Sequence, residues 1–149
     1  MNVRRLRAIA RLMQKYPDHV EMRYWFSRRV ASILSRYGAT YPVSPVRLMS
    51  KPDCNTMGCI GGWALRFSKM TDRRLHEMEW SSIKDHAASL LELSDHEASR
   101  LMLPARYPGE TLCWPIEFQR RYDRAKTPRA RAKVVADRIE HFIVTKGKE

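Results

Sequence analysis

Apolar residues recur every three or four positions along most of this 149-residue chain, which is the spacing of amphipathic α-helices. We expect a first helix from about Asn2 to Tyr16, because Pro17 ends it. A second helix is expected from about His19 to Tyr37, with Asp18 as its cap and Gly38 as its stop. The first quarter of the chain is therefore predicted to form two helices.

Prolines divide the rest of the chain into shorter elements. Three of them exclude a helix between Ala39 and Asp53, where we expect an extended connector with one short strand over Val46–Met49. The later part of the chain carries four helix start signals, which are Ser81 or Ser82, the Ser94–Glu97 capping box, Pro115, and Thr127 followed by Pro128. The four helices are expected to end near Leu93, before Pro104, after Tyr122 and near Val144, with residues 145–149 frayed.

The segment CNTMGCIGGWALRF, residues 54–67, is predicted to form a buried central helix. On a helical projection its large apolar side chains share one face and its three glycines share the opposite face. A helix that is apolar all round lies in a protein core. Because each glycine inside a helix costs about 1 kcal/mol relative to alanine, the glycines indicate that another helix or a ligand approaches the backbone closely. The expected N-cap is Thr56, with Asp53 and Asn55 as alternatives one register earlier.

These patterns together predict an all-α fold, a single domain over residues 1–149 with six to eight helices around the glycine-rich central helix. A hydrophobic content of 44% is ordinary for a globular protein, and the length suffices for a core. No run reaches the ~18 apolar residues of a membrane span, and the basic N-terminus has no secretory cleavage site. We therefore expect a mature cytoplasmic protein with no membrane contact and, with three cysteines, no disulfide framework.

The charge changes this picture, because the chain carries a formal net charge of +12. Residues 1–51 contribute +9, residues 52–100 contribute −2 and residues 101–149 contribute +5. Arginine outnumbers lysine by 20 to 8, and the planar guanidinium suits phosphate better than an ammonium group does. This excess of cations indicates an anionic partner such as nucleic acid, although a solvated basic surface without a specific ligand has the same composition.

The candidate phosphate contacts lie on the first two predicted helices and near the C-terminal ones. They are Arg4, Arg7, Arg11, Arg28, Arg29, Arg36, Arg120, Arg121, Arg124 and Arg129. The aromatic residues that could stack on bases are Trp25, Trp80, Trp114, Tyr24 and Tyr107, whereas Trp63 is expected in the core. Neither glycine-rich phosphate motif of the common nucleotide-binding enzymes is present, so the glycines of residues 55–62 are better explained by helix packing.

The cysteines offer two further kinds of site. Cys54, Cys59 and Cys113 with one histidine could form a Cys3His zinc centre, but buried cysteines more often act as small hydrophobic residues. Cys59 falls in the first turn of the predicted central helix, where the helix dipole would lower its pKa and favour a nucleophile. Its base would have to be His19, His76, His86, His96 or His141. No cofactor is expected.

The central segment resembles a family of small, uncharacterised bacterial and bacteriophage proteins whose core reads Cys-Gly-Thr-x-x-Cys-Ile-Ala-Gly-Trp-Ala. The matching positions are Cys54, Thr56, Cys59, Ile60, Gly62, Trp63 and Ala64. Asn55 replaces a glycine of that pattern and Gly61 replaces an alanine. The resemblance continues thinly through LELSDHEASRLM, CWP and the Thr-Pro-led last helix, to about residue 144. It implies a compact helical protein of phage or prophage origin and carries no activity with it.

The sequence thus favours a small basic binding protein over an enzyme. Its expected ligand bears phosphate and is either nucleic acid or a nucleotide-like molecule. A second hypothesis is an inhibitor whose basic face docks on an acidic host protein, and a third is a cysteine-dependent hydrolase that uses Cys59.

Overall fold

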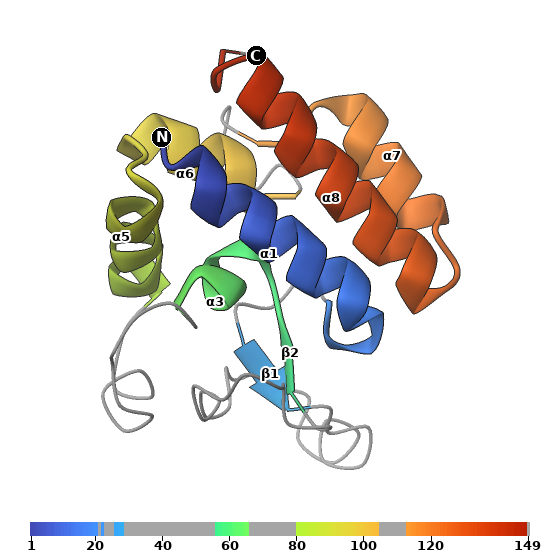
Figure 1. The fold of residues 1–149 in the computed structure, drawn as a ribbon. Helices are drawn as coiled ribbons and strands as arrows, with labels where there is room; N and C mark the ends of the chain where they lie inside the picture. Colours follow the sequence, from blue (N-terminus) through green and yellow to red (C-terminus); the bar gives the residue numbers. More distant parts are fainter. Residues whose placement is uncertain (21, 23–25, 29–55, 66–79, 105–112, 149) are drawn as a thin grey trace.

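The structure is a computed structural model that describes residues 1–20, 22, 26–28, 56–65, 80–104 and 113–148. In these residues the fold is all-α, with six α-helices, one 3-10 helix and one pair of three-residue strands (Figure 1). The elements are α1 (Val3–Lys15), η1 (Pro17–His19), β1 (Phe26–Arg28), β2 (Thr56–Gly58), α3 (Ile60–Leu65), α5 (Trp80–Leu91), α6 (Asp95–Met102), α7 (Ile116–Arg124) and α8 (Pro128–Val144).

The first and last helices begin and end within two residues of the predicted positions, because local signals define both ends. The side chain of Asn2 caps α1 by accepting a hydrogen bond from the backbone N–H of Arg5, at 3.1 Å. Thr127 caps α8 in the same way, and Pro128 occupies the first helical position. The two helices pack against each other along their length, and their apolar stripes are buried in one core.

The shorter C-terminal helices also confirm their start signals. Ser94 and Glu97 form the predicted reciprocal capping box at the start of α6. The carboxylate of Glu97 accepts the backbone N–H of Ser94 at 2.8 Å, which lowers the pKa of this carboxyl. Pro115 stands directly before α7, whose Phe118 and Tyr122 enter the core.

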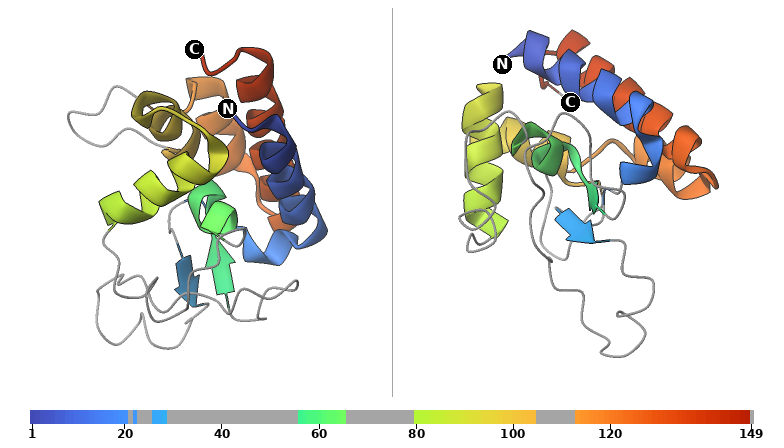
Figure 2. Two further views of the ribbon diagram at one scale, coloured as in Figure 1. Left: turned by 60° about the vertical axis from the view of Figure 1, so that its left-hand side comes forward. Right: turned by 60° about the horizontal axis from the view of Figure 1, so that its bottom comes forward.

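The central segment is buried, as predicted, but its helix begins later than expected, at Ile60. All six residues of α3 are buried, and the helix packs against α5, α1 and α6. The ring of Trp63, only 2% exposed, stacks on Tyr16 with centroids 6.4 Å apart. Its indole N–H donates to the backbone carbonyl of His19 at 3.4 Å. The glycine-rich helix therefore lies in the core among the larger helices, as Figure 2 shows for α3 between α5 and α1.

Two predictions about this region are wrong, for one shared reason. Thr56 is not an N-cap, because Thr56–Gly58 forms β2, and the helix expected over residues 19–37 is replaced at Phe26–Arg28 by β1. The two strands pair antiparallel, with Phe26 opposite Gly58. A backbone segment with a glycine is a poor helix former, and pairing gives its N–H and C=O groups partners. The strand expected over Val46–Met49 and the alternative caps Asp53 and Asn55 lie outside the described residues.

Candidate anion-binding surface

Helices α1, α8 and α7 lie side by side, with α8 in the middle (Figure 1). The contacts between α1 and α8 are the most extensive of any pair of described elements, and α7 packs against the other side of α8. The buried stripe of each helix faces the core, so the opposite stripes of all three are exposed to solvent. This layer brings together basic residues that are more than 100 positions apart in the sequence.

Two ion pairs show that these basic stripes share one surface. Arg7 of α1 donates to the carboxylate of Glu140 on α8, with its Nε 3.1 Å from Oε1. Arg121 of α7 pairs with Asp137, which also accepts Lys133 Nζ at 3.2 Å from its own helix. Because Asp137 and Glu140 are one helical turn apart on α8, guanidinium groups from α1 and α7 converge on the same outward stripe of α8. We call the solvent-exposed side of these three helices the three-helix face.

Seven exposed cations on α1, α7, α8 and the α7–α8 connection have no carboxylate within ion-pair distance among the described residues. They are Arg4, Arg11 and Lys15 on α1, Arg120 and Arg124 on α7, Lys126 in the connection to α8, and Arg129 on α8. Of the ten predicted contact residues, seven lie on α1, α7 and α8, namely the five arginines of this set together with Arg7 and Arg121. Arg28 lies instead on β1, and Arg29 and Arg36 lie outside the described residues.

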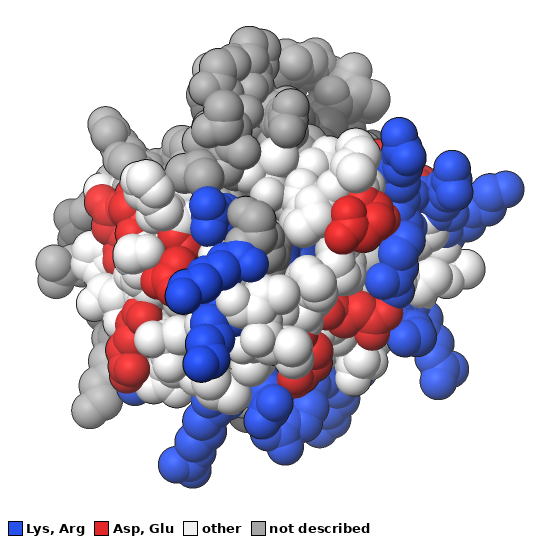
Figure 3. Space-filling view, turned by 90° about the horizontal axis from the view of Figure 1, so that it is seen from above, with Lys and Arg blue, Asp and Glu red and all other residues white. Residues whose placement is uncertain are grey.

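Charge is segregated between the two halves of the described structure. Residues 1–20 and 113–148 contain 15 Lys and Arg against 5 Asp and Glu, whereas residues 80–104 contain 2 against 4. Figure 3 shows the result from above: basic side chains gather along the right and lower edges, and acidic side chains lie both on the left and among the basic ones. The cations are thus concentrated on one side, which is the arrangement that attracts a polyanion.

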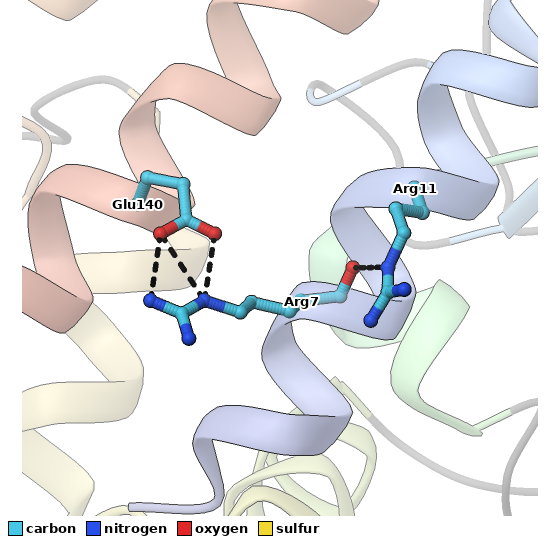
Figure 4. Close-up of polar contacts among 3 residues, drawn as sticks. All are labelled: Arg7, Arg11 and Glu140. Atoms are coloured by element: carbon cyan, nitrogen blue, oxygen red, sulfur yellow. Dashed lines mark hydrogen bonds and ion pairs between the residues drawn. The ribbon is translucent and has the colours of Figure 1, made fainter.

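A groove runs between α1 and α8 on the three-helix face. Its volume is about 230 Å³, and it is lined by Arg7, Ala10, Arg11, Gln14, Ala136, Asp137 and Glu140. The two alanines bring no long side chains to the helix crossing, which leaves the space open. Figure 4 shows the guanidinium of Arg7 on Glu140, and that of Arg11 turned so that its Nε donates to the carbonyl oxygen of Arg7 at 3.3 Å.

Sequence reasoning missed the acidic part of this surface. The pairing of Lys133 with Asp137 has the i,i+4 spacing that a helical projection of α8 reveals. The pairing of Arg7 with Glu140 joins residues 133 positions apart, so no local pattern could indicate it. Gln14 also escaped notice, because a polar residue on the exposed stripe of a helix carries no signal of its own.

The described aromatic residues do not supply a stacking platform for bases. Trp114, predicted as a candidate, is 1% exposed and donates its indole N–H to the carbonyl of Leu101 at 2.6 Å. Its ring also meets Tyr122 edge-on, with centroids 5.9 Å apart, so that prediction is wrong and Trp114 is a core residue. Trp80 begins α5, but its side chain, and all of Tyr24, Trp25 and Tyr107, lie outside what the structure describes.

The environment of Cys59 contradicts the activated nucleophile predicted for it. The side chain is 1% exposed, and desolvation by burial raises the pKa of its thiol to about 12, although backbone hydrogen bonds with Gly62 and Gly61 act in the opposite direction. The thiol is therefore protonated at neutral pH and shielded from a substrate. Cys113 is half-buried, and Cys54 lies outside the described residues. Within the described ranges, no three His, Cys, Asp or Glu side chains cluster to hold a metal ion.

Comparison with known proteins adds no relative to this picture: no family model, curated protein or solved structure matches the chain. Among the described helices, none has the length and apolar character needed to cross a membrane. Inferences about function therefore depend on the three-helix face itself.

Proposed function

We propose that this protein binds nucleic acid through the sugar-phosphate backbone, which lies across the three-helix face. The observation that carries the proposal is the set of seven exposed cations of the described α1, α7 and α8 region that form no ion pair, five of which are arginines. Arginine guanidinium groups bind phosphate oxygens through two parallel hydrogen bonds, and each neutralised phosphate releases counterions from the polymer. A surface of this kind binds with little dependence on base sequence.

A polymer explains the surface better than a nucleotide-like small molecule does. Pockets that enclose small ligands have volumes of about 300–1,000 Å³ and are lined mainly by apolar and aromatic side chains. The α1–α8 groove has a volume of about 230 Å³ and a lining rich in charged side chains. The unpaired cations are also spread over three helices, which one nucleotide could not contact together. The buried position of Trp114 further favours backbone contacts over base stacking.

The proposal is tested by measuring the affinity of the full chain for a short fluorescein-labelled DNA duplex, and for the matching RNA, by fluorescence anisotropy between about 50 and 200 mM NaCl. Each phosphate contact contributes about −0.9 to the slope of log K against log salt concentration, so contacts by all seven unpaired cations give a slope of about −6. Arg124→Gln is expected to weaken binding and make the slope less steep by about 0.9.

The control is Lys84→Gln, which also removes one positive charge but lies on α5, outside the three-helix face, where the ammonium group pairs with Asp95. It is expected to leave the slope unchanged. The proposal is wrong if neither nucleic acid binds at 50 mM salt, or if the two variants change the slope equally. Binding of an acidic protein with no binding of nucleic acid would favour the inhibitor hypothesis instead.

We also propose a cytoplasmic location, where nucleic acid is accessible, and a role as an accessory protein of a phage or prophage. The first rests on the proposed ligand, because nucleic acid is accessible in that compartment. The second rests on the resemblance of residues 54–64 to the bacterial and bacteriophage family described above. Copurification of nuclease-sensitive material from an infected host would support both.

A further inference from the structure

The α1–α8 groove contains one arginine whose outer nitrogens are available. The Nε of Arg11 donates to the carbonyl oxygen of Arg7, which holds the guanidinium against α1 (Figure 4). Its two Nη groups have no hydrogen-bond partner in the part of the chain that the structure describes, and no described carboxylate lies within 4.0 Å. This side chain is therefore positioned by the protein but not neutralised by it.

The other charges around the groove are already compensated. Arg7 makes three contacts of 3.1–3.4 Å with the carboxylate of Glu140, so this pair contributes no net charge. Asp137 is shared by Arg121 and Lys133. Of the two arginines that line the groove, Arg11 is therefore the one without a carboxylate partner among the described residues.

We propose that the groove is a subsite for a single phosphate group, which accepts two parallel hydrogen bonds from the Nη groups of Arg11. The amide of Gln14, on the same stripe of α1 one turn further on, is a further donor. This inference rests on the proposed function, because the phosphate belongs to the nucleic-acid backbone. The groove volume of about 230 Å³ far exceeds the ~10–15 Å³ that one water molecule requires, so a phosphate with part of its hydration shell has room there.

A bidentate subsite makes a specific prediction about arginine and lysine. Lysine keeps the positive charge but cannot donate two hydrogen bonds in a planar fork. Arg11→Lys is therefore expected to weaken binding of the DNA duplex by about tenfold, the effect of losing one charge-assisted hydrogen bond, with the salt slope unchanged. Arg129 is an exposed arginine on α8 outside the groove lining. The loss of affinity in Arg129→Lys is expected to be at least threefold smaller than the loss in Arg11→Lys.

A second measurement on the wild-type chain keeps the test independent of the variants. In proton–nitrogen NMR spectra, the Nε–H signal of Arg11 and the side-chain amide signal of Gln14 are expected to shift when the duplex is added. Equal losses for the two lysine variants, or shifts absent from both groups, would overturn the subsite while wild-type binding still supports the proposed function. Failure of the wild-type chain to bind the duplex would instead contradict the proposed function itself.

Discussion

Replacing Glu140 by glutamine is expected to make the protein bind nucleic acid more tightly and with a steeper dependence on salt. In the wild type, the guanidinium of Arg7 is paired with the carboxylate of Glu140, which accepts hydrogen bonds from Nε and Nη2 of Arg7. A neutral amide of the same shape cannot compete with a phosphate for that guanidinium. Arg7 would then join the unpaired cations of the three-helix face and add one phosphate contact.

The expected size of the effect follows from one additional contact. The slope of log K against log salt concentration becomes steeper by about 0.9, so the affinity ratio of variant to wild type changes by about 3.5-fold between 50 and 200 mM NaCl. Stability should change little, because the side chains of the pair are 51% and 46% exposed. Exposed ion pairs of this kind contribute about 0–1 kcal/mol to the free energy of unfolding.

Anisotropy titrations with the labelled duplex and thermal unfolding of the same samples test this prediction. Glu117→Gln is the matched control, since Glu117 is exposed on α7 and forms no ion pair with another described residue. In the double variant Arg7→Gln with Glu140→Gln, the gain should disappear, because the released guanidinium is gone. If Glu140→Gln leaves the slope unchanged, or if the double variant keeps the gain, the carboxylate does not act through Arg7.

Three further predictions concern stability and reactivity. The pKa of Glu97 is lowered in the folded state, so its ionised carboxylate stabilises the fold above the ordinary carboxyl pKa. This stabilisation is lost as pH falls through the lowered pKa. The free energy of unfolding of Glu97→Gln should therefore depend less on pH in the acid range than that of the wild type. Gly147→Ala should lower the melting temperature by roughly 2–8 °C, because φ is +70° and the new Cβ would lie 3.1 Å from Phe142 Cζ, whereas Lys146→Gly, at φ +54°, should change it little. Iodoacetamide should modify Cys59 only after unfolding, as peptide mass spectrometry can show.

Helices with complete local signals could be predicted from the sequence with accurate bounds. Thr127 and Pro128 define the start of α8 within a few residues of the chain, and the Ser94–Glu97 box does the same for α6. The burial of the glycine-rich segment was also predictable, because an apolar residue occurs on every side of its helix. In these cases, interactions between residues that are close in the sequence determine the structure.

The β1–β2 pair shows where that reasoning fails. Phe26 and Gly58 are 32 positions apart, and each strand is only three residues long. The helical period of residues 19–37 is a local signal. At Phe26–Arg28 hydrogen bonding to β2, which is distant in the sequence, determines the structure instead. The same limit applies to the candidate site, since its cations were visible as stripes but their arrangement on one surface depends on the packing of α1 and α7 against α8.

The position of α8 gives the surface its chemical character. A helix with only basic residues on its outer stripe would repel the arginines of the helices on both sides, and charges of one sign at close range oppose the compact state. Asp137 and Glu140 reduce that repulsion by pairing with a cation from each side. The same two carboxylates neutralise cations that would otherwise contact phosphate. Packing of the layer and affinity for a polyanion are therefore opposed at these two positions. Only cations without a carboxylate partner, among them Arg11 in the lining of the groove, are available to a ligand.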